Sequence, residues 1–171
     1  RRNGLSHVSV TMAALAGREG PASLAIHPLD AGAHTLGDLA NKPKEQRDDT
    51  NIRRQTVRTM TLDQVVRDND LSAIDFMKMD VEGAEQLVLQ GGRESLAAGV
   101  VKAVVAEVAD DNQSMFGFTA DSLVGAFADL GFAPYRLGAV LTPWSRGTDP
   151  NGVENVLFVK DKTFLAGCQL R

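Results

Sequence analysis

The chain has 171 residues, a formal net charge of −4 and 43% hydrophobic residues. This composition favours one globular domain and excludes disordered and collagen-like chains. The acidic balance argues against a nucleic-acid partner, because neutralising phosphates requires clustered Lys and Arg. No stretch reaches the ~18 uninterrupted apolar residues of a membrane-spanning helix, so we expect a soluble, cytoplasmic protein without a membrane partner. The single cysteine, Cys168, excludes an intrachain disulfide and a multi-cysteine zinc site.

The first third of the chain predicts short strands around a long loop. Residues 7–14 (HVSVTMAA) alternate apolar and polar side chains, which is typical of a half-buried strand. Residues 22–26 predict a second short strand. The hydrophobic pattern then lapses, so we expect a loop insertion over residues 27–58 within a single domain. Alternation returns over residues 55–62, where we expect a strand, and Asp63 is expected to begin a helix.

Strands and helices alternate from residue 71 onward. The pattern predicts four strands and two helices: strands 74–79, 100–108, 133–137 and 153–160, and helices 83–90 and 119–130. Strand 100–108 is almost continuously apolar, as expected for a strand covered on both faces of a parallel sheet. The last two strands suit an antiparallel hairpin. Together these elements indicate an α/β layer fold, in which ligands bind outside the carboxyl ends of the strands.

Three carboxylates follow the predicted strand 74–79: Asp80, Glu82 and Glu85, with Gly83 among them. In one interpretation the glutamates compensate the positive end of the next helix and Gly83 permits a tight turn. In the other, Asp80 and Glu82 project into the crevice at the strand end. There they orient a cationic ligand or accept a proton from a substrate hydroxyl. The spacing leaves both interpretations open.

Residues 74–92, IDFMKMDVEGAEQLVLQGG, resemble the signature of the FkbM-type methyltransferase family, a strand ending in Lys-x-Asp-x-Glu-Gly-x-Glu before a helix and glycines. Further stretches agree in order, among them Thr35-Leu36 and residues 155–159, and the resemblance covers nearly the whole chain. It implies a Rossmann-like methyltransferase fold with the strand order 3-2-1-4-5-7-6. It also implies S-adenosylmethionine as cofactor and methylation of a hydroxyl oxygen on a sugar or natural product.

The resemblance also assigns strands and site residues. Residues 7–14 correspond to the third strand, 74–79 to the fourth, 100–108 to the fifth, and the hairpin to the last two. Cofactor contacts are expected from residues beside the adenine and beside the methionine end: Ala13, Ala14, Asp80 and Val81. Positioning or base chemistry is expected from Asp80 and Glu82, and then from His34, which lies in a loop near the expected rim of the site.

Two family features would precede Arg1: the glycine-rich loop that holds the methionine moiety and the acidic residue that binds ribose. We therefore expect an incomplete fold that lacks its first two strands and this loop. The parent protein is then a methyltransferase, and the 171 residues alone are catalytically impaired. The alternative is a non-catalytic α/β module, either a relic or a partner-binding remnant. The acceptor is expected to be a small molecule or a glycan.

Other residues have two interpretations each. Glu107 either faces the cofactor side or satisfies backbone donors near the strand end. Asp110 and Asp111 offer oxygen ligands for a hard cation together with Asp80, but no spacing fixes their geometry and we expect no metal. Trp144 either stacks on a sugar ring or covers the hairpin.

Overall fold

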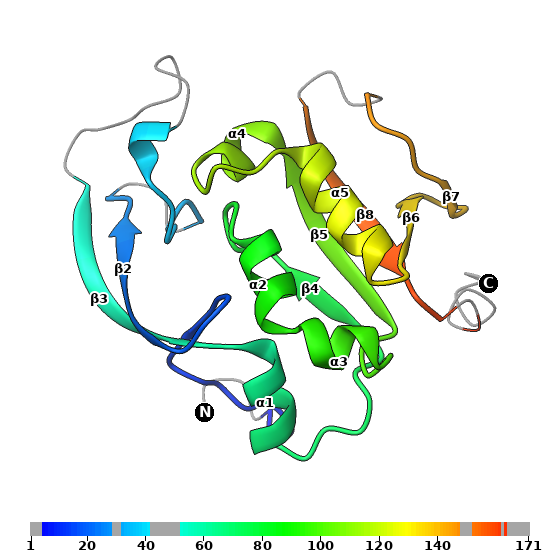
Figure 1. Cartoon of the computed structure of the whole chain (residues 1–171), viewed down its shortest axis with the longest axis horizontal. Coiled ribbons are helices and arrows are strands. Elements are labelled where there is room, and N and C mark those ends of the chain that lie inside the picture. Colours follow the sequence, from blue (N-terminus) through cyan, green and yellow to red (C-terminus); the bar gives the residue numbers. More distant parts are fainter. Residues whose placement is uncertain (1–4, 29–31, 42–51, 148–151, 162, 164–171) are drawn as a thin grey trace.

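The computed structural model describes residues 5–28, 32–41, 52–147, 152–161 and 163. These residues form a three-stranded and a five-stranded sheet with helices beside them (Figure 1). The strands are β1 (Ala14–Leu15), β2 (Gly20–Ile26), β3 (Arg53–Met60), β4 (Met77–Met79), β5 (Ala103–Ala109), β6 (Ala133–Arg136), β7 (Thr142–Pro143) and β8 (Val153–Val159). The helices are η1 (Leu39–Asn41), α1 (Leu62–Asp68), α2 (Glu85–Gly91), α3 (Arg93–Ala97), α4 (Asp110–Ser114) and α5 (Ala120–Asp129).

The five-stranded sheet has the order β4-β5-β8-β6-β7. β4 and β5 are parallel, whereas β8 runs antiparallel to both β5 and β6. In the expected numbering, β4 is the fourth strand, β5 the fifth, β6 the sixth and β8 the seventh. The observed order of these four strands is then 4-5-7-6, as in the corresponding half of the expected sheet. The mixed α/β class is therefore confirmed for the described chain.

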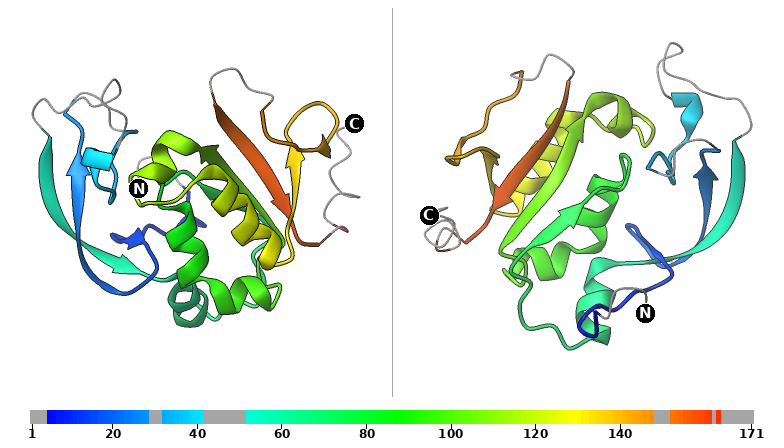
Figure 2. Two further views of the ribbon diagram at one scale, coloured as in Figure 1. Left: turned by 45° about the horizontal axis from the view of Figure 1, so that its top comes forward. Right: turned by 180° about the vertical axis from the view of Figure 1, so that it is seen from behind.

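One face of the five-stranded sheet is covered by α2, α3 and α5 (Figures 1 and 2). Alternate β5 residues, among them Val104 and Val108, belong to the large core cluster that includes residues of these helices. The β5 residues on the opposite face, Ala103 and Val105, pack in a second cluster with residues of β8. β5 is thus buried on both faces, as its apolar run predicts. In the large cluster, Phe127 of α5 stacks on Phe158 of β8 with ring centroids 3.7 Å apart.

The three-stranded sheet has the order β1-β3-β2. β2 and β3 are antiparallel along the whole of β2, and β1 adds a two-residue parallel pairing with β3. β3 begins at Arg53, so residues 53–58 at the end of the predicted loop insertion belong to this strand. Within that insertion, residues 29–31 and 42–51 lie outside the described residues.

The prediction that residues 7–14 form the third strand is wrong, because Ala14 is the one residue of this stretch that is in a strand. Val10 and Met12 are 87% and 95% exposed. An alternating pattern stabilises a strand only when a neighbour supplies backbone partners and packing surface. Among the described residues no strand lies beside residues 7–13. The apolar side chains of residues 7–13 therefore have no neighbouring strand to pack against in the described part of the chain.

The predicted helix 119–130 corresponds to α5, whereas α1 begins at Leu62 after its N-cap Thr61 and not at Asp63 as predicted, because the Thr61 side chain caps the first turn. Thr119 is the N-cap of α5, and its side chain and that of Ser122 form a reciprocal capping box. Gly131, just after α5, has the left-handed φ of 83° that favours glycine. The short helices α3 and α4 were not predicted. None of the helices in the described part of the chain is long and apolar enough to cross a membrane.

Candidate active site

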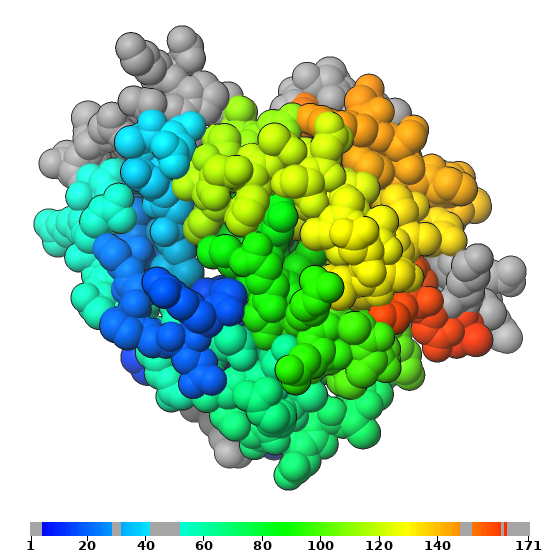
Figure 3. Space-filling model, viewed as in Figure 1, coloured from blue at the N-terminus to red at the C-terminus, as the bar shows by residue number. Residues whose placement is uncertain are grey.

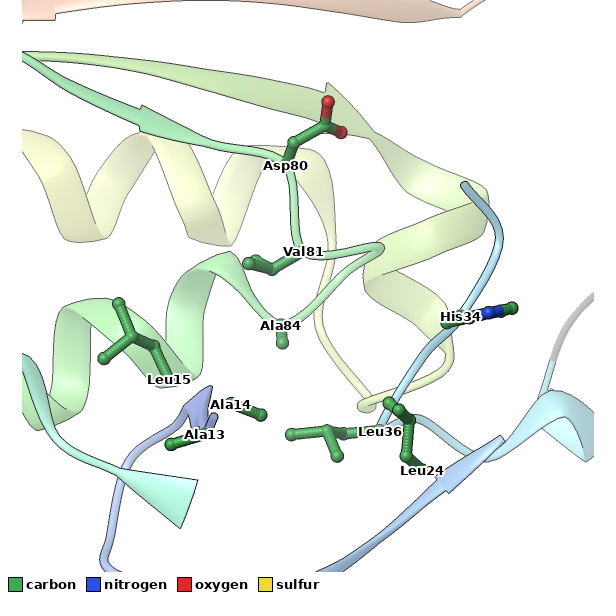
Figure 4. A pocket seen from close by; sticks show the side chains of 9 residues that line it. All are labelled: Ala13, Ala14, Leu15, Leu24, His34, Leu36, Asp80, Val81 and Ala84. Atoms are coloured by element: carbon green, nitrogen blue, oxygen red, sulfur yellow. The ribbon is translucent and has the colours of Figure 1, made fainter. Parts of the chain in front are cut away.

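A cavity of about 320 Å³ is lined by residues of β1 and β2, of the segment after β2, and of the turn and helix start after β4 (Figure 4). Its lining residues are Ala13, Ala14, Leu15, Leu24, His34, Leu36, Asp80, Val81 and Ala84. Five of the six predicted site residues are in this set, and Glu82 is the exception. The cavity therefore gathers, from three separate segments, residues that the resemblance assigned to one site.

The lining is apolar inside and polar at its edges. In Figure 4 the alanine, valine and leucine side chains lie together, whereas Asp80 and His34 lie at the margins with their polar ends pointing away from that group. The Asp80 side chain is 59% exposed. Figure 3 shows the N-terminal segment, blue, packed beside the green surface around α2. The cavity can thus hold an apolar group inside and a charged group at its rim.

The turn after β4 has an unusual backbone. Glu82 has φ 48° and Gly83 has φ 92°, the left-handed region that non-glycine residues rarely adopt. A Cβ atom at Gly83 would lie 2.1 Å from the carbonyl oxygen of Asn112, so the backbone of α4 packs directly against the turn. Position 83 therefore requires glycine for both its conformation and its packing.

Glu82 is held by contacts from two other segments. The Thr35 hydroxyl donates a 2.9 Å hydrogen bond to the Glu82 carbonyl oxygen. The Asn112 amide donates to Glu82 Oε2 at 3.2 Å and to Glu107 Oε1 at 2.8 Å. These bonds offset the cost of the left-handed conformation at Glu82.

Asp80, Glu82 and Glu107 form a carboxylate cluster in which one oxygen of each lies within 4.8 Å of the others. The bonds from Asn112, and an ion pair between Lys78 Nζ and Asp80 Oδ2 at 3.2 Å, partly compensate the negative charge. Oxygen ligands of this kind suit a hard cation or a positively charged ligand group. Glu107 thus lies beside Glu82, and the bond it accepts comes from the Asn112 side chain.

The other acidic residues after β5 are outside this carboxylate cluster. Asp110 accepts a hydrogen bond from the Ala120 amide at 2.9 Å and pairs with Arg146. Arg146 also pairs with Asp121 at 2.5 Å, and these two aspartates hold the pKa of its guanidinium above the usual value. Asp110 therefore joins α4, α5 and the loop after β7, a role that its position in the sequence did not reveal.

Glu85 is a buried carboxyl with its own partners. It is 1% exposed, Oε2 accepts a 2.7 Å bond from Gln113 Nε2, and Oε1 accepts from the Val81 amide at 3.4 Å. Burial raises the pKa of Glu85, and the hydrogen bonds oppose this shift in part. Glu85 thus ties the cavity turn to α4, in addition to its predicted place at the positive end of a helix.

His34 lies on the cavity wall, and one of its ring nitrogens accepts a hydrogen bond. The backbone amide of His27 donates to His34 Nδ1 at 3.2 Å. Because Nδ1 of His34 accepts this bond, that nitrogen faces His27 of its own segment.

Trp144 packs against the core of the five-stranded sheet and its indole N–H donates to the Glu154 carboxylate. These contacts support its covering role over sugar stacking. Four lining residues of the cavity were not predicted: Leu15, Leu24, Leu36 and Ala84. The resemblance included Leu15 and the Thr35-Leu36 pair but gave neither leucine a role.

Comparison with known proteins supports the resemblance. The family model of the methyltransferase FkbM domain matches residues 2–134, a range that contains every residue of the cavity and of the carboxylate cluster. Neither the curated proteins nor the solved structures yield a match. Because the family model covers well over half of the chain, the chain belongs to the FkbM methyltransferase domain family.

Proposed function

We propose that this domain serves the transfer of a methyl group from S-adenosylmethionine to a hydroxyl oxygen of a sugar or natural-product acceptor, and that the cavity binds the cofactor. The observation that carries the proposal is the meeting of Ala13, Ala14, Asp80 and Val81 on one cavity, beside the carboxylate cluster. Membership in a methyltransferase family supports the reaction class.

The residues of the cavity fit such a cofactor. Small side chains, those of Ala13, Ala14 and Ala84, leave room for a flat base, and the leucines supply apolar contact. The volume of about 320 Å³ is within the range of about 300–1,000 Å³ that is usual for ligand sites. Asp80, exposed at the rim, would hold a cationic or hydrogen-bond-donating part of the cofactor. The remaining residues would hold its apolar part.

When bound, S-adenosylmethionine supplies a methyl group attached to a positively charged sulfur. The protein then has to hold the acceptor hydroxyl in line with that methyl group, exclude water, and take up the hydroxyl proton. The carboxylates of Asp80 and Glu82 are the groups that would orient the acceptor and accept the proton. Asp80 is the more accessible of the two, because its side chain is exposed whereas Glu82 is half-buried.

The test is the affinity of S-adenosylhomocysteine, the demethylated cofactor, measured by titration calorimetry. We expect saturable binding by the wild-type chain. Because a hydrogen bond to a charged group contributes about 1.5–3 kcal/mol, Asp80→Asn should weaken the affinity about 10- to 100-fold. Binding is a more direct readout than turnover, since it requires no choice of acceptor.

Asp75→Asn is the matched control. Asp75 lies before β4, at the end opposite Asp80, is also paired with a lysine (Lys102, 2.6 Å), and does not line the cavity. Its variant should bind as the wild type does. The proposal fails if the wild-type chain shows no saturable binding, or if Asp75→Asn weakens binding as much as Asp80→Asn does.

A further inference from the structure

We propose that Thr35 is a positioning residue of this site: its hydroxyl holds the cavity wall that carries His34 and Leu36 against the turn that carries Asp80 and Val81. The identity of the ligand in this inference rests on the proposed function. Thr35 itself does not line the cavity. It would act through Glu82, whose carbonyl oxygen it binds.

The Thr35 hydroxyl both donates and accepts a hydrogen bond. Thr35 is 2% exposed, its Oγ1 donates to the Glu82 carbonyl at 2.9 Å, and it accepts from the Gly37 amide at 3.0 Å. A hydroxyl has a single hydrogen to donate, so the bond to Glu82 takes its whole donor capacity. This one side chain therefore joins two segments that are 47 residues apart in the sequence.

The wall around Thr35 is fixed on its other sides. The backbone of Thr35 exchanges two hydrogen bonds with Ala25 of β2, at 2.8 and 3.2 Å. Further along, the Asp38 amide donates to the Met115 carbonyl at 3.1 Å, and a Cβ atom at Gly37 would lie 2.7 Å from the Met115 side chain. The wall is thus held between β2 and the end of α4, and the Thr35 hydroxyl supplies its bond to the turn.

The turn depends on such outside contacts because Glu82 is in the left-handed region, with φ 48°. Removing the Thr35 hydroxyl leaves the side-chain bond from Asn112 but takes away the bond to the Glu82 carbonyl. We expect the turn then to relax and to shift Asp80 and Val81 relative to His34 and Leu36. The same residues would then line the cavity, but the distance between its two walls would no longer be fixed.

Three variants separate this role from a structural one. Thr35→Val keeps the shape and removes the hydroxyl, whereas Thr35→Ser keeps the hydroxyl. Thr59→Val is the matched control, since Thr59 is 4% exposed and its hydroxyl bonds the carbonyls of Arg18 and Gly20 rather than the turn. Titration with S-adenosylhomocysteine should show about tenfold weaker binding for Thr35→Val, the loss expected for one hydrogen bond. The other two variants should stay within about threefold of the wild type.

A second readout, amide hydrogen exchange, needs no ligand. Thr35→Val should speed exchange at Gly37, whose amide loses its acceptor, and at Gly83 and Ala84 in the turn. Thr35→Ser should restore the wild-type rates. If the wild-type chain does not bind S-adenosylhomocysteine, the proposed function fails, and the exchange rates still decide whether Thr35 holds the turn.

The inference is overturned if Thr35→Ser binds as weakly as Thr35→Val, or if Thr59→Val matches Thr35→Val. Unchanged exchange at Gly83 and Ala84 in Thr35→Val would also overturn it. Should Thr35→Val not fold, wild-type exchange decides the matter. Added S-adenosylhomocysteine should then slow exchange at Gly37 more than at Asn41, which lies at the end of the same segment, and equal slowing at both amides contradicts the inference.

Discussion

The two sheets of this domain differ in how their strands are buried. β5 and β8 lie in the middle of the five-stranded sheet, and β5 is covered on both faces. β3, the middle strand of the other sheet, has most of its residues exposed and becomes buried only at Thr59 and Met60. The first sheet thus has a continuous core, whereas the second is held mainly by strand pairing.

The proposed site lies where these two regions of different burial meet. The cavity takes its walls from β1, β2 and the segment after β2 on one side and from the turn after β4 on the other. The turn lies at the edge of the well-packed region, where Glu85 and Asn112 also bond to it. The wall is held by β2 and the end of α4, so the bond from the Thr35 hydroxyl to the Glu82 carbonyl sets the position of the turn relative to the wall.

The largest expected loss of stability follows from a substitution in the core of the five-stranded sheet. Phe127 is fully buried, stacks on Phe158 and meets Phe132 edge-on at 5.7 Å. Phe127→Ala should lower the free energy of unfolding by about 3–5 kcal/mol, because it leaves a cavity among these rings. Urea denaturation measures this. Phe76→Ala, at a residue 51% exposed, is the control, and equal losses in both variants would contradict the comparison.

A smaller change in stability, which depends on pH, is expected from Glu85, where the turn meets α4. Burial raises the pKa of Glu85, so the folded protein binds this proton more tightly than the unfolded chain does. The stability of the wild type relative to Glu85→Gln should therefore fall as pH rises from about 4 to 7, by about 1.4 kcal/mol for each unit by which the pKa is raised.

Urea denaturation of both proteins across that pH range measures the difference. Glu94→Gln, at an exposed carboxylate in the first turn of α3, is the control and should follow the wild type. A difference between wild type and Glu85→Gln that does not change with pH, or one that grows in favour of the wild type, would show that Glu85 is not a carboxyl destabilised by burial.

The smallest effect is expected in the segment before β1. Met12 is 95% exposed, so Met12→Ala should change the free energy of unfolding by less than about 0.5 kcal/mol. Met79→Ala, at a residue of β4 that is 2% exposed, should cost about 2–5 kcal/mol. Comparable losses in the two variants would mean that residues 7–13 pack as a strand after all.

The sequence predicted the five-stranded region well because its signals are local. The apolar run of β5 and the Thr119 cap of α5 each depend on neighbouring residues. Residues 7–14 carried an equally clear alternation and form no strand beyond Ala14, since pairing depends on a neighbour that the pattern does not report. Periodicity therefore predicts a strand's faces but not its partners.

The candidate site was predicted in part, through the resemblance rather than through periodicity. Ala13, Ala14 and Val81 carry no chemical signal of their own, and their assignment came from the family pattern. The contacts that shape the site were not predicted. Thr35 with Glu82, and Glu85 with Gln113, join positions 47 and 28 residues apart, and no local pattern indicates which distant residues meet.

Alanine methyl groups in the cavity wall would report whether the cavity binds the methyl donor. In a titration of the chain, labelled at its alanine methyl groups, with S-adenosylhomocysteine followed by NMR, we predict saturable shifts for Ala13, Ala14 and Ala84. Ala103 and Ala106, both fully buried in β5, should stay unchanged. Saturation without shifts at the three cavity alanines, or no saturable shift at any alanine, would contradict the account.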